Sequence, residues 1–209
     1  MDTNYVKDLL TNTIDVVQSL YENEEKLWMS EVIPKPLDEI VKIANACVNA
    51  LKNGNKIFFM GNGGSAAEAQ HLAGELVSYF MQHSKPYAAL ALNTDTSVIT
   101  AIANDMGYHH IFSRQIEALG RPGDVAIYLS TSGLSKNILE AMNVAKNMGI
   151  INVGFTGMKT RYMQTYSDYY VAIPSTYTPQ IQEGHLILGH ILCQLIEERI
   201  ESKTLHDDF

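Results

Sequence analysis

Two side chains that could move protons or hold a metal lie close together in the segment "AQHLAGELV". His71 and Glu75 are four residues apart, so they share one face of a predicted helix. Imidazole and carboxylate groups serve as metal ligands and also as general acids and bases. An isolated pair at this spacing is more often a solvated surface pair. Here the apolar neighbours Leu72, Leu76 and Val77 favour a functional interpretation.

A second polar series lies near the C-terminus. Gln182 and His190 are separated by two four-residue steps, and His190 interrupts the apolar run "LILGHILCQLI". A histidine in such a run is often a hydrogen-bonded core residue. Two helices that each carry a histidine and a second ligand-capable residue nevertheless favour a shared site, provided that the fold brings them together.

A cluster of hydroxyl groups predicts a phosphate site. The segment "STSGLS" (130–135) contains Ser130, Thr131, Ser132 and Ser135 immediately before a predicted helix. A helix N-terminus offers free N–H donors and a partial positive charge, and hydroxyls add donors without formal charge. Serine and threonine are also favoured helix caps, which would account for one of these residues. Four together indicate a phosphate or sugar-phosphate site.

A glycine-rich turn, "GNGGS" (61–65), follows the apolar run "KIFFM". It has neither the lysine of a P-loop nor the G-x-G-x-x-G spacing of a dinucleotide fold. Its glycines, including Gly63 and Gly64, allow close backbone approach. Asn62 and Ser65 carry groups that bind ligand hydroxyls or cap the next helix. Taken alone, an ordinary capped turn explains this loop equally well.

Composition excludes several classes of protein. The 209 residues are 46% hydrophobic and carry a net charge of −8 without any block of Lys or Arg, so we expect no nucleic-acid partner. Cys47 and Cys193 lie in apolar patterns and are predicted to be buried small hydrophobes. The polar, acidic start is unlike a signal peptide, and no apolar run approaches the roughly 20 residues that span a bilayer. We expect a soluble, cytoplasmic protein without a membrane partner.

Hydrophobic periodicity predicts the elements that position these residues. Five short apolar runs predict strands, at 56–60, 87–93, 124–130, 149–157 and 168–174. Helices are predicted at 6–27, 37–51, 66–80, 96–104, 111–119, 136–148 and 182–201. The tyrosine-rich segment 161–170 is expected to be a loop outside the chemistry, up to the start of the fifth strand.

This alternation predicts an α/β fold, a mainly parallel five-stranded sheet flanked by helices. Ligands in such sheets bind outside the carboxyl ends of the strands, where the glycine turn and the hydroxyl cluster lie. Residues 1–55 form an N-terminal helical segment that either covers the sheet or packs against another subunit. Residues 56–209 are expected to contain the sheet and its covering helices, and the two parts together are expected to make one structural domain.

With these motifs assembled, the chain resembles the SIS (sugar isomerase) domain family, and within it the phosphoheptose isomerases. The resemblance covers nearly the whole chain. It rests on segments in matching order and spacing: "GNGGSAAEAQHLAGELVSYF", "AIANDMGYHHIFSRQIEALGRPGDV", "STSGLSKNILEAM" and "IQEGHLILGHILCQLIE".

The resemblance implies roles for individual residues. Glu75 would be the base that moves a proton between C1 and C2 of the sugar, and His190 its partner acid or base. One zinc ion per subunit would be associated with His71, Glu75, Gln182 and His190. Substrate would be bound by Asn62, Gly63, Gly64, Ser65, Glu75, Asn104, Asp105, Ser130, Thr131, Ser132, Ser135 and Gln182. Family members are homotetramers with active sites at subunit boundaries.

The implied reaction converts D-sedoheptulose 7-phosphate into D-glycero-D-manno-heptose 7-phosphate through an enediol. It is the first step towards nucleotide-activated heptose for lipopolysaccharide or capsule. Two alternatives stay open: an isomerase or epimerase of another phosphorylated sugar, and a non-catalytic SIS-domain protein that binds a sugar phosphate or associates with the DnaA initiator. The segment "TPQIQ" departs from the family pattern at Pro179 and Gln180, which bears on the distal sugar contacts.

Overall fold

A five-stranded parallel sheet forms the centre of the molecule. The computed structural model describes every residue except 1, 2, 23, 25, 29, 30, 82–84, 159, 160, 208 and 209. All neighbouring strands of the large sheet run parallel, in the order β4-β3-β5-β6-β7. The strands are β3 (Ile57–Gly61), β4 (Ala89–Ala91), β5 (Val125–Ser130), β6 (Ile151–Thr156) and β7 (Tyr169–Ala172). The predicted fold class is confirmed.

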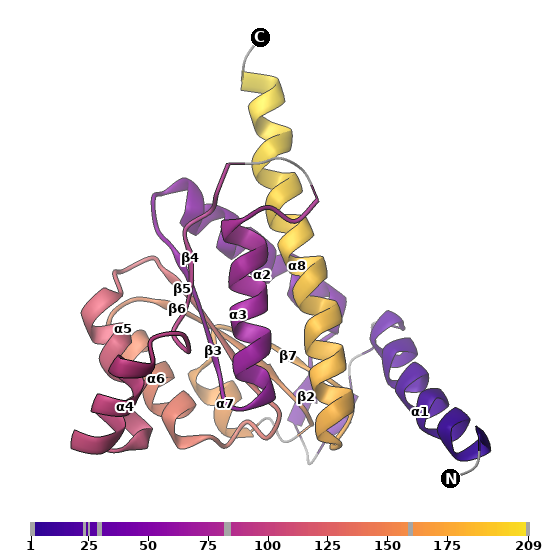
Figure 1. Ribbon diagram of the computed structural model, residues 1–209. Helices are drawn as coiled ribbons and strands as arrows, with labels where there is room; N and C mark the ends of the chain where they lie inside the picture. The colour runs from indigo at the N-terminus through magenta and orange to yellow at the C-terminus, as the bar shows by residue number, and fades with distance from the viewer. Residues whose placement is uncertain are drawn as a thin grey trace.

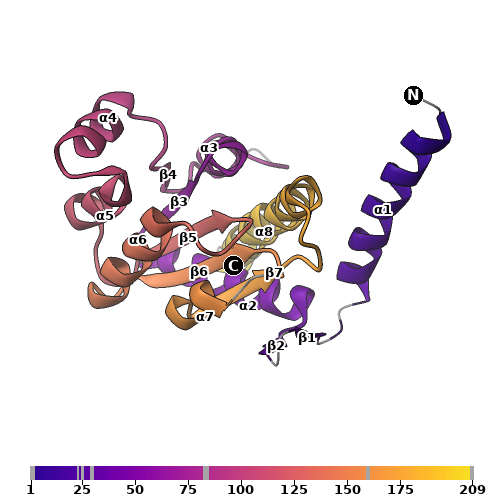
Figure 2. The ribbon, with the colours of Figure 1, turned by 90° about the horizontal axis from the view of Figure 1, so that it is seen from below.

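Helices cover both faces of this sheet (Figures 1 and 2). Alternate side chains of β3 explain why, since Ile57 and Phe59 join one buried cluster and Phe58 and Met60 join the other. The first cluster is closed by α2 (Pro36–Lys52), α3 (Gly64–Val77) and α8 (Thr178–Asp207). The second is closed by α4 (Thr96–Asp105), α5 (Ser113–Leu119), α6 (Lys136–Asn147) and α7 (Arg161–Tyr166), with the 3₁₀ turn η1 (Tyr108–His110) between α4 and α5.

The N-terminal helix stands apart from these layers. In Figures 1 and 2, α1 (Thr3–Tyr21) projects to one side of the sheet and its covering helices. Its apolar side chains are largely exposed, including Val6, Leu10 and Ile14 at 56%, 60% and 53%. By contrast, α2 is part of the layer that covers the sheet. The division of the chain at residue 55 stays a prediction.

Three sequence predictions were wrong at the level of local structure. The helix predicted over 6–27 ends at Tyr21, because β1 (Lys26–Trp28) and β2 (Glu31–Ile33) pair as an antiparallel hairpin. The helix predicted from residue 111 begins at Ser113, after the 3₁₀ turn. Part of the segment predicted as a loop forms α7, whose Met163 is fully buried under the sheet. The remaining helices and strands lie where they were predicted, with ends displaced by a few residues.

Close packing of α3 against α8 brings distant parts of the chain together. A Cβ atom on Gly189 would lie 2.8 Å from both Leu72 methyl carbons, so any larger residue there would have to displace the Leu72 side chain. The Cys193 thiol is 3.9 Å from the Leu72 carbonyl oxygen. Both cysteines are buried and free, as predicted, and burial raises the pKa of the Cys193 thiol to about 12. The outcome is that the polar series of the two helices face each other.

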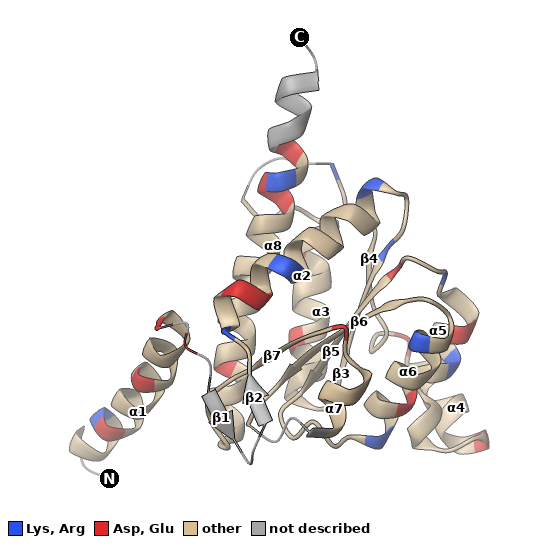
Figure 3. Cartoon of the chain, turned by 180° about the vertical axis from the view of Figure 1, so that it is seen from behind, with Lys and Arg blue, Asp and Glu red and all other residues tan. Residues whose placement is uncertain are grey.

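Charged residues are scattered over the surface. On the side seen in Figure 3, Lys and Arg occur singly on α2, α5 and α6 among acidic residues. Among the described residues, no helix combines the length and the apolar character needed to cross a bilayer.

Candidate active site

The two ligand-binding loops predicted from sequence are neighbours in space. β3 and β5 are adjacent in the sheet, and Gly61 is paired with Leu129 at their carboxyl ends. The glycine turn follows β3 and the serine loop follows β5, so both emerge at the same edge of the sheet. This edge is where open parallel sheets bind ligands.

The glycine turn requires its glycines for two different reasons. Gly63 precedes α3 with φ of +58° and ψ of −121°, a backbone conformation that side chains disfavour. A Cβ on Gly64 would lie 2.5 Å from Nε2 of Gln182, so the second requirement is close approach by α8. Ser65 is buried, and its hydroxyl oxygen accepts a long hydrogen bond, 3.4 Å, from Nε2 of Gln182. No side chain caps α3 here, so the ordinary capped turn is not what the structure shows.

The serine loop is closed by its own hydrogen bonds. The Gly133 N–H donates to the Ser130 carbonyl at 3.1 Å, and the Leu134 N–H donates to the Ser132 hydroxyl at 3.2 Å. The hydroxyls of Ser130 and Ser135 lie 3.3 Å apart. Ser135 occupies the N-cap position of α6, yet its side chain makes no capping hydrogen bond. Helix capping therefore does not account for this hydroxyl, which strengthens the phosphate interpretation.

Three candidate catalytic and metal-binding side chains converge between α3 and α8. The Nε2 atoms of His71 and His190 lie 2.7 Å apart, although the residues are 119 positions apart in the chain. Nε2 of His71 lies 3.2 Å from Oε1 of Glu75. One ligand atom from each of the three residues lies within 4.8 Å of the others. The sequence favoured a site shared by these two helices provided that the fold brings them together, and the structure places them side by side.

These three residues fit a metal ion. Zinc bonds of 2.0–2.1 Å in tetrahedral geometry place neighbouring ligand atoms about 3.3 Å apart. The 3.2 Å between His71 and Glu75 matches this spacing, and the 2.7 Å between the imidazoles needs only a small ring rotation. Two histidines and a carboxylate are also a common zinc donor set. The structure thus supports a metal site formed by His71, Glu75 and His190.

Gln182, by contrast, lies at the glycine turn. Its amide contacts Gly64 and Ser65, on the turn of α3 that precedes the metal triad. This position suits a contact to the substrate. Glutamine is an uncommon zinc ligand, and a role for Gln182 in metal binding stays a prediction.

The setting of His190 depends on a segment that sequence reasoning missed. The Phe80 ring stacks on His190, with centroids 5.5 Å apart and planes inclined by 22°. The chain at Phe80 and Met81 is held by Glu197, whose carboxylate accepts their N–H groups at 3.2 and 2.8 Å. Glu197 is buried, and no local pattern in the sequence distinguishes it from the exposed acidic residues of α8. His185, one turn before Gly189, is instead a core residue, and burial lowers its pKa to about 4.

Asn104 and Asp105 end α4 and lie at the surface. The Asn104 amide donates to the Asp105 carboxylate at 2.7 Å. Shortly after them, the Tyr108 hydroxyl donates to Oδ1 of Asn62 at 3.0 Å, which ties this segment to the glycine turn. The structure therefore brings the segment to the site, and direct substrate contacts from Asn104 and Asp105 stay predictions.

Glu68 is a further carboxyl on the metal-site face of α3. It lies one turn before His71 and shares the face of Gly64 and Glu75. Burial raises the pKa of Glu68 to about 7, although a hydrogen bond with the Ser65 hydroxyl opposes the shift. Its Oε2 atom is buried without a hydrogen-bond partner among the described residues. The sequence signal was the three-residue spacing to His71, which was not interpreted as functional.

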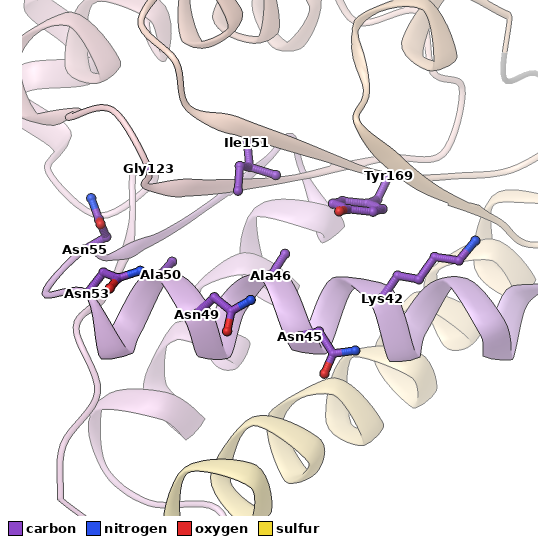
Figure 4. A pocket seen from close by; sticks show the side chains of 10 residues that line it. All are labelled: Lys42, Asn45, Ala46, Asn49, Ala50, Asn53, Asn55, Gly123, Ile151 and Tyr169. Atoms are coloured by element: carbon purple, nitrogen blue, oxygen red, sulfur yellow. The ribbon is translucent and has the colours of Figure 1, made fainter.

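A surface cavity elsewhere on the molecule contains none of these groups. Its volume is about 390 Å³, and it lies between α2 and the amino ends of the strands (Figure 4). Asn45, Asn49 and Asn53 line one wall, and Tyr169 lies opposite. Because the amino ends of parallel strands are the edge opposite the expected ligand site, this cavity is not the catalytic centre.

Comparison with known proteins identifies the family. Residues 20–157 match the family model described as the SIS domain. A phosphoheptose isomerase from Aneurinibacillus thermoaerophilus is 45% identical over 197 residues, which is 94% of each chain. The chain belongs to the phosphoheptose isomerase family. Another member, from Paramagnetospirillum magneticum, is 50% identical over 86% of this chain and 93% of its own.

The fold agrees with that of a solved phosphoheptose isomerase. The enzyme from Neisseria gonorrhoeae superposes with a TM-score of 0.83 at 35% identity, over 94% of this chain and 98% of its own. An aldose–ketose isomerase of this family needs a phosphate site, contacts to sugar hydroxyls and a proton-transfer pair. The serine loop, the glycine turn with Gln182, and the Glu75–His190 cluster supply groups suited to each need.

The buried Glu68 carboxyl predicts a pH-dependent change in stability. Its folded-state pKa of about 7 lies above the value of about 4.3 for an exposed glutamate, so the folded chain holds this proton more tightly. This residue therefore costs stability as pH rises from about 4.5 to 7. Glu68→Gln should raise the midpoint of thermal unfolding by roughly 2–4 °C at pH 8, after allowance for partial solvent screening.

At pH 4.5 the same variant should unfold at the wild-type temperature. The exposed Glu183 on α8 offers a matched control, and Glu183→Gln should leave the midpoint unchanged at both pH values. Calorimetry of the three proteins at the two pH values measures the effect. A Glu68→Gln shift of equal size at pH 4.5 and pH 8 would contradict the assignment of a raised pKa.

Proposed function

We propose that this chain interconverts D-sedoheptulose 7-phosphate and D-glycero-D-manno-heptose 7-phosphate, as expected of a phosphoheptose isomerase. The observation that carries the proposal is the cluster of His71, Glu75 and His190 between α3 and α8, because α3 begins at the glycine turn that lies beside the serine loop. A binding protein or scaffold needs the loops but has no use for a proton-transfer pair beside them. The product would enter nucleotide-activated heptose synthesis, and the expected cytoplasmic setting stays a prediction.

We assign Glu75 as the base. In the ketose, its carboxylate removes a proton from C1 and, after the enediol has formed, returns it to C2. The exposed fraction of its side chain is 23%, so the carboxylate is partly shielded but still accessible. A carboxylate has two oxygens, so one can ligate a metal while the other carries the proton.

We assign His190 as the group that manages the proton on oxygen. As the enediol forms and collapses, one hydroxyl proton must leave O1 and one must arrive at O2. An imidazole can donate and accept at neutral pH, which suits this shuttle. Stacking on Phe80 fixes the plane of the His190 ring. Because Nε2 is engaged by His71 at 2.7 Å or by a bound metal, Nδ1 is the ring nitrogen left for the shuttle. In another isomerase fold, a glutamate likewise acts on the proton on carbon and a histidine acts at the oxygen.

The loops bind the two ends of the substrate in this proposal. The serine loop and the first turn of α6 hold the phosphate through Ser130, Thr131, Ser132 and Ser135. The turn Asn62-Gly63-Gly64-Ser65 and Gln182 contact the sugar at the reacting end, together with Asn104 and Asp105. A zinc ion held by His71, Glu75 and His190 would polarise a substrate oxygen when bound.

The base assignment predicts the behaviour of Glu75→Gln. Because the amide cannot take a proton from carbon, kcat should fall by about 10²–10⁴-fold while KM changes only a few-fold. The measurement is conversion of sedoheptulose 7-phosphate in D₂O, with deuterium at C2 of the aldose scored by NMR. Glu183→Gln, on an exposed position of α8, should retain full activity. Retention of more than a fifth of the wild-type kcat by Glu75→Gln would remove Glu75 from this role.

The metal assignment predicts the ion content of protein prepared without chelator. Wild-type protein should contain about one zinc per chain, while His71→Ala and His190→Ala should each lose most of it. His109→Ala provides a matched control, because this exposed histidine lies on η1, away from the cluster. Elemental analysis measures the content directly. Equal zinc in His71→Ala and wild type would place the ion elsewhere.

We also propose that the chain assembles as a homotetramer through α1. The exposed apolar side chains Val6, Leu9, Leu10 and Ile14 recur at helical spacing on a helix that stands to one side of the other elements (Figure 2). A contiguous apolar face of this kind is typical of a subunit interface. In a single chain the side chain of His71 is 45% exposed, so a neighbouring subunit would help to close the site.

The assembly proposal predicts the effect of a charge on α1. Leu10→Asp should dissociate the tetramer, because it would bury an unpaired carboxylate in the interface. Sedimentation velocity gives the mass of the species. Tyr162→Asp is a control on α7, where the side chain is 58% exposed, and it should leave the mass unchanged. A tetramer that survives Leu10→Asp would show that α1 is not the main interface.

A further inference from the structure

Two asparagine amides face each other between the glycine turn and α6. Nδ2 of Asn62 donates to Oδ1 of Asn137 at 2.9 Å, and Nδ2 of Asn137 donates back to Oδ1 of Asn62 at 2.8 Å. The two residues are 75 positions apart in the chain. Reciprocal hydrogen bonds of this kind fix both the distance and the relative orientation of two planar groups.

The pair is embedded in further hydrogen bonds. Oδ1 of Asn137 also accepts the Ile138 N–H at 3.1 Å, and Oδ1 of Asn62 accepts the Tyr108 hydroxyl at 3.0 Å. Asn137 is only 3% exposed. Both acceptor positions of the Asn62 carbonyl are therefore used within the protein, and its amide nitrogen has one hydrogen left for a ligand.

The position of the pair gives it a functional meaning. Asn62 lies in the turn that follows β3, and Asn137 lies in the first turn of α6, two residues after Ser135. The pair thus bridges the loop assigned to the reacting end of the sugar and the loop assigned to the phosphate. The sheet already holds the two loops at one edge, and the amide pair adds a direct side-chain link between them.

Each loop is otherwise held by contacts of its own. The serine loop has the bonds within 130–135 described above, and the Gly157 N–H donates to the Thr131 carbonyl at 3.3 Å. On the other side, Nδ2 of Asn93 donates to the Gly61 carbonyl at 2.7 Å, which ties the glycine turn to the end of β4. Loss of the amide pair would therefore free the two loops to shift relative to each other while each keeps its local shape.

We propose that the Asn62–Asn137 amide pair sets the separation between the phosphate site and the site of proton transfer, so that Asn137 is a positioning residue for the isomerisation. The inference rests on the proposed function, because it needs a substrate that occupies both loops at once. It also revises the expected role of Asn62, whose side chain acts mainly through Asn137 rather than on sugar hydroxyls. Small errors in such a separation cost rate, because the reacting carbon then lies off the base.

The experiment compares Asn137→Ala, Asn62→Ala and the double variant with wild type. For sedoheptulose 7-phosphate, we expect kcat/KM to fall by about 10- to 100-fold in Asn137→Ala, with a lower kcat as well as a higher KM. Inorganic phosphate, used as a competitive inhibitor, occupies one loop only. Its inhibition constant should therefore change less than about two-fold, and the double variant should be no worse than the poorer single variant.

Asn152 provides the matched control for lost stability. Its buried amide makes three hydrogen bonds at the amino edge of the sheet, with the Tyr128 hydroxyl and the carbonyls of Met142 and Tyr166. Asn152→Ala should lower the unfolding temperature at least as much as Asn137→Ala yet keep kcat/KM within about three-fold of wild type. Tyr108→Phe keeps the amide pair and should show a smaller loss of kcat/KM than Asn137→Ala.

Three results would overturn the inference. They are an unchanged kcat/KM in Asn137→Ala, a parallel loss of phosphate affinity, or effects of Asn62→Ala and Asn137→Ala that multiply in the double variant. Failure of the proposed function is a different result, because wild-type protein would then not convert the heptulose phosphate. In that case, a thermal double-mutant cycle on the same variants, with and without inorganic phosphate, decides whether the two asparagines act as one unit.

Discussion

The close contact between α3 and α8 is the constraint on which the rest of the site depends. The two helices carry the only described histidine–carboxylate cluster suited to a metal, and each contributes part of it. Gly64 and Gly189 remove the side chains that would hold the helices apart, at positions opposite Gln182 and Leu72. Interiors pack as densely as crystals, so a single added methyl at either position must displace a neighbour. The geometry of the site therefore depends in part on two residues that have no side chain.

The order of the strands supplies the second constraint. Because β3 and β5 are adjacent and parallel, the chain delivers two loops to one edge from segments about 70 residues apart. In the proposed mechanism, each loop holds one end of the sugar phosphate. The sheet fixes their approximate spacing, and the reciprocal amide contact between Asn62 and Asn137 fixes it more finely. Such positioning matters for rate, because the reacting carbon must lie close to the base.

The sequence was informative wherever a pattern is local. Apolar runs located all five strands of the large sheet, and the alternation with helices predicted their parallel arrangement. The hairpin at residues 26–33 was missed because three-residue strands leave no periodicity, and the mixed residues after Tyr21 prolong a helical pattern by chance. Helix α7 was missed because its six residues are tyrosine-rich and lack a repeated apolar face.

For the site, spacing paired His71 with Glu75 and suggested a shared site with His190, and the fold was needed to show that the two helices meet. The roles of Asn137, Glu197 and Glu68 escaped sequence reasoning for a common reason. Each is a polar residue whose significance comes from burial or from a partner distant in the chain, and neither is visible in one sequence. For Gln182, by contrast, a local pattern suggested more than the fold shows. Its helical spacing to His190 suggested a common ligand set, yet its amide is directed to the glycine turn.

The 119-residue separation of His71 and His190 has a consequence for biosynthesis. During translation, α3 leaves the ribosome long before α8, and the strands β4, β5, β6 and β7 of the large sheet are made in between. Until α8 docks, Leu72 and its neighbours on α3 have no cover on that side, and Glu75 stands without its partner imidazole. Docking of the last helix therefore completes the hydrophobic core and the reactive cluster in one event. In the proposed mechanism, a nascent or truncated chain that lacks this helix would have no His190 and therefore no complete proton-transfer pair.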